Sequence, residues 1–570
     1  MRKYIYTVGI ALTGISMQSQ TLQEAMVKTD NERFEAADKD LRSLISKDPS
    51  KGEYYFNLGE NFFANGIQDR DASLIDSANF YYAKGSEINA TNALNYVGLG
   101  KVLLYNGKTN DAKAQFFKAA SVAQNKNAEV MRRTAEAWIL TDNKNPDEAI
   151  AQLNNAIKLD SKTAENYILM GDAQLEKNPT DGSGPIKSYQ QATTLNPKSA
   201  KGILREGKLY QRGRNYQLAL EKYKAALTLD PTFAPAYREI AELYYLAGQN
   251  SKSIEHWKKY LELNNSDYAR YRFMSALFKN KQYSDAITEY ENLKKSNFKN
   301  VYLDRIAGMS YYEIGDAKDK DAYSKGLDAL NDFFNSAGPK FKYLGSDFKY
   351  KGMLLMKTGK DSLGMIELEK AIQLDTSMAG EIYSEIAYSN YKNKNYEGAV
   401  NYYEKKIGRG ASSMNNNDWY NLGKSYYFPA VTKLNEAANT KDAKVKAAKE
   451  AEAIPALIKA DSAFANLVRK NPSWIPAYVW RGRANSLIDS KVEREDTKLI
   501  YEKVLSLIKP EELNANKKDA VEAYEYLGAY YLNKKDKAKA DEMWTKVKEL
   551  DPENQKAKYY FTPPKQPVKK

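Results

Sequence analysis

Apolar residues recur at helical spacing along almost the whole chain, in pairs of short segments separated by a polar turn. The clearest pair spans residues 200–233, and its apolar positions are Leu204, Gly207, Leu209 and Tyr210, then Ala219, Leu220, Tyr223, Ala226 and Leu227. Gly213 to Asn215 predicts a turn between two helices, and Asp230–Pro231 predicts the end of the second. Gly207 and Ala219 are small where the helices would approach closely. A pair of about 34 residues cannot bury its own apolar face, so it needs similar pairs on either side.

Other parts of the chain repeat this spacing. Three good copies contain Tyr96, Leu99, Gly100, Ala112, Phe116 and Ala119; Gly352, Gly364, Leu368 and Ala371; and Tyr524, Leu527, Gly528, Ala540, Trp544 and Pro552. This order of small, aromatic, Ala and Pro residues resembles the tetratricopeptide repeat (TPR) family. The resemblance implies an all-α superhelix, or α-solenoid, of about fourteen TPR-like helix-turn-helix repeats.

The repeat frame, the insertions and the two ends predict the layout of the chain. Its parts are a signal peptide (1–19), an N-terminal TPR array (20–300), an enlarged TPR-like repeat (301–344), further TPR repeats (345–427), a charged helical insertion (428–459), C-terminal TPR repeats (460–560) and a basic, Pro-rich tail (561–570). The first part has Arg2 and Lys3 before a mostly apolar run and ends in small or polar residues, as secretory signals do. We expect an exported protein, and a retained membrane anchor is the alternative. We expect no transmembrane segment in the mature chain.

Composition excludes several kinds of partner and reaction. The formal net charge is +13, but no long basic run or Arg-rich face accompanies it, so we expect a Lys-rich solvated surface and no nucleic-acid partner. The chain has no cysteine, which excludes disulfides, thiolate nucleophiles and a lipid-modified N-terminal cysteine. The single histidine, His256, has no second histidine or cysteine to work with. No phosphate loop or nucleophile elbow is present, so we predict no enzyme, no cofactor and no metal site.

Aromatic residues point to a binding surface. The TPR resemblance implies that positions two, five, nine and twelve of each first helix line the concave face of the superhelix. In the second half of the array these positions hold many tyrosines with interspersed cations, which are typical of binding hot spots. The predicted partner-binding residues are Arg238, Tyr245, Tyr271, Arg305, Tyr312, Lys349, Tyr388, Tyr391, Tyr420, Lys424 and Tyr427. Packing between helices is the alternative for each of them.

These observations predict a non-catalytic scaffold or assembly factor of the bacterial cell envelope, periplasmic, outer-membrane-associated or secreted. Its partner would be a protein or peptide held in the concave groove, with a possible association with an envelope complex. The alternative is a glycan-binding helical protein of the cell surface or periplasm, because tyrosine rings also stack on sugars.

Overall fold

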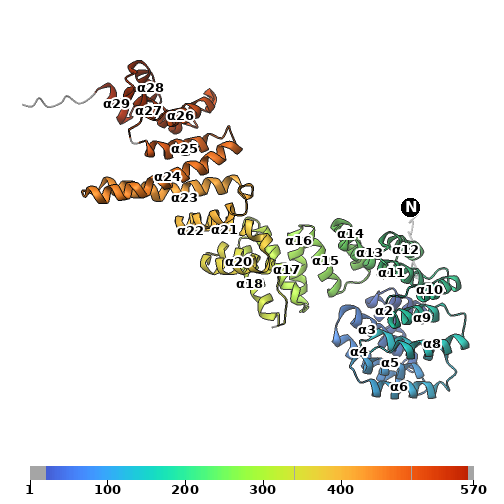
Figure 1. Cartoon of the computed structure of the whole chain (residues 1–570). Coiled ribbons are helices and arrows are strands. Elements are labelled where there is room, and N and C mark those ends of the chain that lie inside the picture. The colour runs from blue at the N-terminus through green and yellow to red at the C-terminus, as the bar shows by residue number, and fades with distance from the viewer. Residues whose placement is uncertain (1–20, 339, 490, 563–570) are drawn as a thin grey trace, which may run out of the picture. The chain divides into compact units, whose positions relative to one another are not determined.

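The computed structural model describes residues 21–338, 340–489 and 491–562 of the chain. These residues form 29 α-helices, which pair consecutively from α1/α2 to α27/α28 and leave α29 single (Figure 1). The structure therefore confirms an all-α solenoid of about fourteen helix pairs. The expected signal peptide and residues 563–570 of the expected tail lie outside the described residues.

The pair α11/α12 (Ala200–Arg212 and Tyr216–Leu229) follows the sequence pattern closely. The turn between its helices lies at residues 213–215, as predicted, and the side chain of Asn215 accepts a hydrogen bond from the backbone of Leu218. Tyr223 is fully buried, and its ring lies so close to Gly207 that a Cβ there would approach it to 2.6 Å. The small residue thus sets how closely the two helices pack.

The chain divides into two compact units, each described separately below. Unit 1 holds the described residues up to Ala322 and residues 329–336, and unit 2 holds residues 323–328 and those from Ala337 onward. The further helices of unit 1 are α1 (Leu22–Asp30), α2 (Phe34–Lys47), α3 (Gly52–Asp69), α4 (Ala72–Ile88), α5 (Ala93–Tyr105), α6 (Thr109–Val122), α7 (Ala128–Leu140), α8 (Pro146–Leu159), α9 (Ala164–Lys177), α10 (Ser183–Leu195), α13 (Ala234–Leu246), α14 (Asn250–Leu263), α15 (Asp267–Lys279), α16 (Tyr283–Lys295) and α17 (Val301–Ile314).

One helix, α18 (Ala322–Ser336), contributes to both units. The helices of unit 2 are α19 (Gly345–Lys357), α20 (Asp361–Leu374), α21 (Ala379–Lys392), α22 (Tyr396–Ile407), α23 (Asn416–Ala438), α24 (Ala443–Lys470), α25 (Ile475–Ile488), α26 (Glu495–Leu507), α27 (Lys517–Asn533), α28 (Lys537–Leu550) and α29 (Gln555–Phe561). Three short 3-10 helices, at Thr376–Met378, Ala411–Ser413 and Pro510–Glu512, lie in loops of this unit.

Residues 428–459 fall within the hairpin of α23 and α24, which have 23 and 28 residues. A small core of Ala430, Ala453 and Leu457 holds the two helices together there, and Leu487 and Ile488 of α25 pack against it. The extra chain length therefore lengthens two packed helices.

The chain from α1 to α3 contacts helices α13 to α15 of the same unit. Glu32, between α1 and α2, accepts hydrogen bonds from the Arg238 guanidinium at 2.7 and 3.2 Å and from the Tyr260 hydroxyl at 3.0 Å. Asn31 donates to the Asp230 carboxylate at 2.7 Å. The guanidinium of Arg70 lies 5.3 Å from the centre of the Tyr268 ring. Unit 1 therefore curves back on itself, and we call these contacts the closure of unit 1.

Candidate partner-binding site

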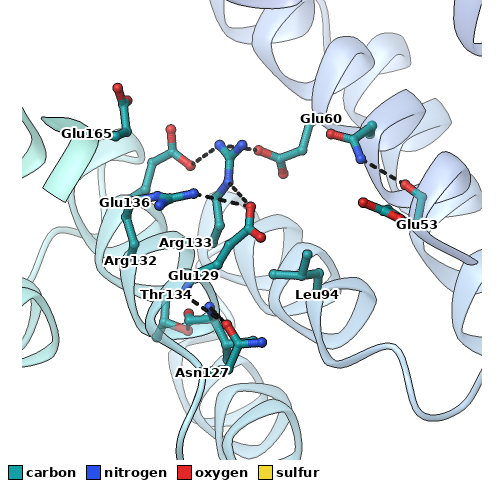
Figure 2. A network of polar contacts seen from close by, with 12 residues as sticks. Glu53, Glu60, Leu94, Asn127, Glu129, Arg132, Arg133, Thr134, Glu136 and Glu165 are labelled. Carbon is teal, nitrogen blue, oxygen red and sulfur yellow. Dashed lines mark hydrogen bonds and ion pairs between the residues drawn. The ribbon is translucent and has the colours of Figure 1, made fainter. Parts of the chain in front are cut away.

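The inner face of unit 1 carries a buried network of charges from α3, α5 and α7. The Lys101 ammonium lies 2.8 Å from a Glu60 carboxylate oxygen and 3.4 Å from one of Glu136. Figure 2 shows Arg133 between the same two carboxylates, at 3.4 Å from Glu60 and 3.1 Å from Glu136. Lys101 itself is only 1% exposed. Each charge in this network therefore has an opposite charge within contact distance.

The electrostatics of the network favour its ionised state. Burial would raise the pKa of the Glu136 carboxyl, but the charges of Lys101 and Arg133 outweigh burial and hold that pKa well below its usual range. Breaking this network for a ligand would expose buried charges to a medium that solvates them poorly. We infer that it serves the fold.

The cations further along this face are also paired with carboxylates of unit 1. Lys201 pairs with Glu165 and lies 3.4 Å from Asp30, Arg205 lies 3.0 Å from Asp172, and Lys208 lies 3.3 Å from Glu239. Between them and the network lies a cavity of about 280 Å³, which Met26, Phe63 and Phe233 also line. The inner face of unit 1 thus presents cations that its own carboxylates already neutralise.

Five predicted site residues lie in this unit, and several of them serve it structurally. Arg238 is held by Glu32 and Glu239, and Tyr271 is 8% exposed and packs near Tyr268 and Phe298. The half-buried Tyr245 ring has Arg272 and Lys279 at 5.2 and 4.0 Å from its centre. The remaining two, Arg305 and Tyr312, are half-buried on α17.

The other predicted residues lie in unit 2, on α19, α21 and α23. Lys349 pairs with Glu381 at 2.7 Å. Tyr388 is 49% exposed, and Tyr391, three residues further along α21, is half-buried on the same side of the helix. Burial raises the pKa of the Tyr391 hydroxyl, with smaller effects from nearby Tyr396, Tyr420 and Tyr388.

The structure brings the three predicted residues of α23 together with aromatic side chains of neighbouring helices. The Trp480 ring lies 5.1 Å from Tyr427, 5.8 Å from Phe428 and 6.4 Å from Tyr420, measured between ring centres. Phe428 lies 5.6 Å from Tyr396, which in turn lies 6.1 Å from Tyr391. We call this set the aromatic cluster: Tyr391, Tyr396, Tyr420, Tyr427, Phe428 and Trp480.

Two cations lie over the aromatic cluster. The Lys424 ammonium is 4.0 Å from the centre of Tyr420 and 4.8 Å from that of Trp480. The Arg483 guanidinium is 4.9 Å from Trp480 and pairs with Glu522 at 2.7 Å. Lys424, in contrast, has no carboxylate within ion-pair distance among the described residues. It is therefore a cation that a partner's carboxylate could neutralise.

Sequence reasoning missed Tyr396, Phe428 and Trp480. Trp480 donates a hydrogen bond from its indole nitrogen to the Tyr420 hydroxyl at 2.9 Å, which fixes both rings. It lies on α25, one position away from those counted as concave, so the repeat frame excluded it. The half-buried Arg483, three residues further along α25, holds one of the counted positions, so it could have drawn attention to this helix.

Residues 97–164 and 204–268 match the tetratricopeptide repeat family model. The match and the helix pairs support the TPR family. No curated protein matches the chain.

Among solved TPR structures, the C-terminal part of a TPR repeat-containing protein from Cytophaga hutchinsonii is 29% identical, covering 50% of this chain and 97% of its own, with a TM-score of 0.39. A thermophilic TPR protein from Thermus thermophilus is 22% identical, covering 32% and 98%, with a TM-score of 0.28. A tetratricopeptide repeat protein from Parabacteroides merdae is 15% identical, covering 44% and 93%, with a TM-score of 0.29.

TPR repeats are generally non-catalytic scaffolds that contact other proteins. Over the described ranges, no group of three or more acidic or histidine side chains is arranged to hold a metal ion. His256 has its Nδ1 atom 2.8 Å from the Lys252 carbonyl oxygen, one turn earlier in its own helix. Within the same ranges, no helix is both long and apolar enough to cross a membrane.

Proposed function

We propose that the protein is a TPR scaffold that binds a segment of a partner protein on the aromatic cluster of unit 2. The observation that supports this most is the combination of half-buried rings with Lys424, a cation without a carboxylate partner among the described residues. Large rings with polar edges supply contact area at little cost in conformational entropy. The inner face of unit 1, where the cations are already paired, offers less to a partner.

The chemistry of the site favours a particular kind of segment. Tyr388 offers exposed ring surface near Tyr391, and Tyr391 is near Tyr420, the ring under Lys424. A segment with an apolar side chain and a nearby Asp or Glu would suit these rings and this cation. A pre-formed surface on packed helices lowers the ordering cost of binding. Lys349, the remaining predicted residue of this unit, is already paired with Glu381.

We also propose that the protein is exported and works as an assembly factor in the bacterial cell envelope. The support is the arrangement of charges and apolar residues in positions 1–19. Cell fractionation with mass spectrometry of the mature N-terminus tests this. An intact N-terminus in the cytosolic fraction would reject export.

The binding proposal is tested by affinity capture from native envelope extracts. The wild-type chain should retain a set of proteins that the combined variant Tyr388→Ala, Tyr391→Ala and Lys424→Ala loses. Tyr216→Ala is the matched control, because Tyr216 is 51% exposed, as Tyr388 is 49% exposed, and it lies in unit 1. Equal capture by the folded triple variant would reject the site. Binding to a glycan array that the same variant abolishes would instead establish the glycan-binding alternative.

A further inference from the structure

The junction between α6 and α7 differs from most other junctions between repeats. Second helices such as α8, α12 and α20 end on an aspartate in extended conformation, which leads directly into the next repeat. After α6, Ala123 stays near helical conformation, and Gln124 and Asn125 both adopt left-handed conformations with φ of 53° and 52°. As a result α6 lies less closely against α7 than α8 does against α9.

This looser junction leaves a cavity of about 590 Å³ between α6 and α8, with α7 as its floor. Its apolar lining includes Phe116, Ala120, Val130, Met131 and Trp138. The rings of Phe116 and Trp138 meet edge to face at 5.5 Å and are almost fully buried, so this wall is rigid. The cavity is thus a hole with a fixed apolar floor on the surface formed by the second helices of the repeats.

A large apolar side chain stands at the edge of the hole. Phe117, on α6, is 78% exposed, and Leu159 at the end of α8 is 50% exposed. Single exposed apolar residues are ordinary on protein surfaces, but an exposed ring beside an apolar cavity forms a continuous patch. The patch therefore contains both a projecting ring and a cavity larger than that ring.

Charges of both signs surround the patch. Lys113 and Lys158 line the cavity, and neither has an ion-pair partner among the described residues. Glu148 also lines it, and its carboxylate accepts a hydrogen bond from Gln152 at 3.0 Å. A two-fold interface requires a surface that complements itself, and this patch offers a ring for a cavity and a lysine for a carboxylate.

We propose that a second copy of this chain docks here, with a two-fold axis through the patch and the Phe117 ring of each copy in the cavity of the other. The surface lies on α6–α8 of unit 1 and is separate from the aromatic cluster of unit 2. The dimer proposal can therefore fail without affecting the partner-binding proposal, and the reverse also holds. The dimer would present two partner-binding surfaces from one assembly.

Sedimentation equilibrium of the full chain at about 0.15 M salt, where long-range repulsion between like-charged copies is screened, tests the dimer. We expect Phe117→Ser to weaken self-association by at least about 100-fold, because it removes two buried rings per dimer. Phe80→Ser is the matched control, since Phe80 is 58% exposed on α4 and does not line the cavity. It should leave self-association unchanged.

A second variant tests the cavity itself. Ala120→Trp fills the hole while keeping Phe117, so it should be monomeric under the same conditions. Mixing it with Phe117→Ser should produce heterodimers, because one copy then supplies the ring and the other the open cavity. Circular dichroism confirms that each variant is folded. Any of three results would overturn the proposal. The wild type could be monomeric, Phe80→Ser and Phe117→Ser could have equal effects, or the mixture could be as monomeric as each variant alone.

Discussion

At the scale of single residues, close helix packing depends on glycines that face a large ring. In the pair α11/α12, Gly207 lies against the fully buried Tyr223, whose hydroxyl donates a hydrogen bond to Gln211 at 2.6 Å. The same arrangement recurs at Gly171 against Tyr189 and at Gly482 against Tyr501. The Tyr223 ring is fixed by its own backbone at one end and by the hydrogen bond of its hydroxyl at the other. It therefore cannot move aside for a larger neighbour.

We predict that Gly207→Ala destabilises the protein by about 1–3 kcal/mol through overpacking, in spite of the higher helix propensity of alanine. The added Cβ would lie 2.6 Å from the Tyr223 ring. Gly213→Ala is the control: Gly213 has φ of −74°, and the nearest atom to its Cβ is 3.5 Å away. Urea unfolding measures both. If Gly207→Ala left the free energy of unfolding unchanged, the two helices would have room for the added Cβ.

At the scale of helices, three first helices of unit 1 are joined by buried charges as well as by apolar contacts. Lys101 on α5 contacts Glu60 on α3 and Glu136 on α7. Leaving one side of such a network without its partner is costly, because the remaining charge is poorly solvated.

We predict that Lys101→Met lowers the free energy of unfolding by about 3 kcal/mol, near the lower end of the usual range because Arg133 still contacts both carboxylates. Lys177→Met is the control, since Lys177 and Asp147 form an ion pair with side chains 56% and 72% exposed. That change should cost about 1 kcal/mol or less. Equal losses in chemical denaturation would contradict a structural role for the buried network.

The sequence predicted the helix pairs well because their determinants are local. Gly207, Ala219 and Tyr223 lie within one pair, so helical spacing alone assigns them to the contact between its helices. It also placed Tyr420, Lys424 and Tyr427 on one side of one helix. It could not place Trp480 beside them, because that contact depends on how each repeat is rotated relative to the next. Rotation between repeats is a property of packing across pairs and has no fixed spacing along the chain.

At the scale of the whole molecule, no short stretch of the sequence indicates the closure of unit 1. Glu32 and Arg238 are 206 positions apart, and only the accumulated curvature of the intervening repeats brings them together. Counting positions put Arg238 on the concave face, yet could not show that a carboxylate from the first repeat reaches it. In a solenoid, each repeat ordinarily contacts its neighbours alone. The closure adds long-range contacts between the first helices and α13 to α15, so we expect this part of unit 1 to unfold cooperatively.

Asp69, at the end of α3, makes this closure sensitive to pH. Burial raises the pKa of its carboxyl to about 6, a hydrogen bond with Ser266 opposes this in part, and the nearby charges of Asp267, Glu32 and Asp71 raise it further. The folded state therefore binds this proton more tightly than the unfolded state, whose pKa is near 3.8. The resulting stabilisation is complete below about pH 4 and is lost as the pH rises through about 6.

We predict that lowering the pH from 7 to 5 stabilises unit 1 of the wild type by about 1 kcal/mol relative to the variant Asp69→Asn, which cannot titrate. Because the chain forms two compact units, thermal unfolding should show two transitions, and only that of unit 1 should carry this difference. Calorimetry at both pH values measures it, with Asp76→Asn as a control for the loss of an exposed carboxylate on α4. If Asp69→Asn and Asp76→Asn followed the same pH dependence, the Asp69 carboxyl would not be the sensitive group. If both transitions shifted together, the two units would not unfold independently.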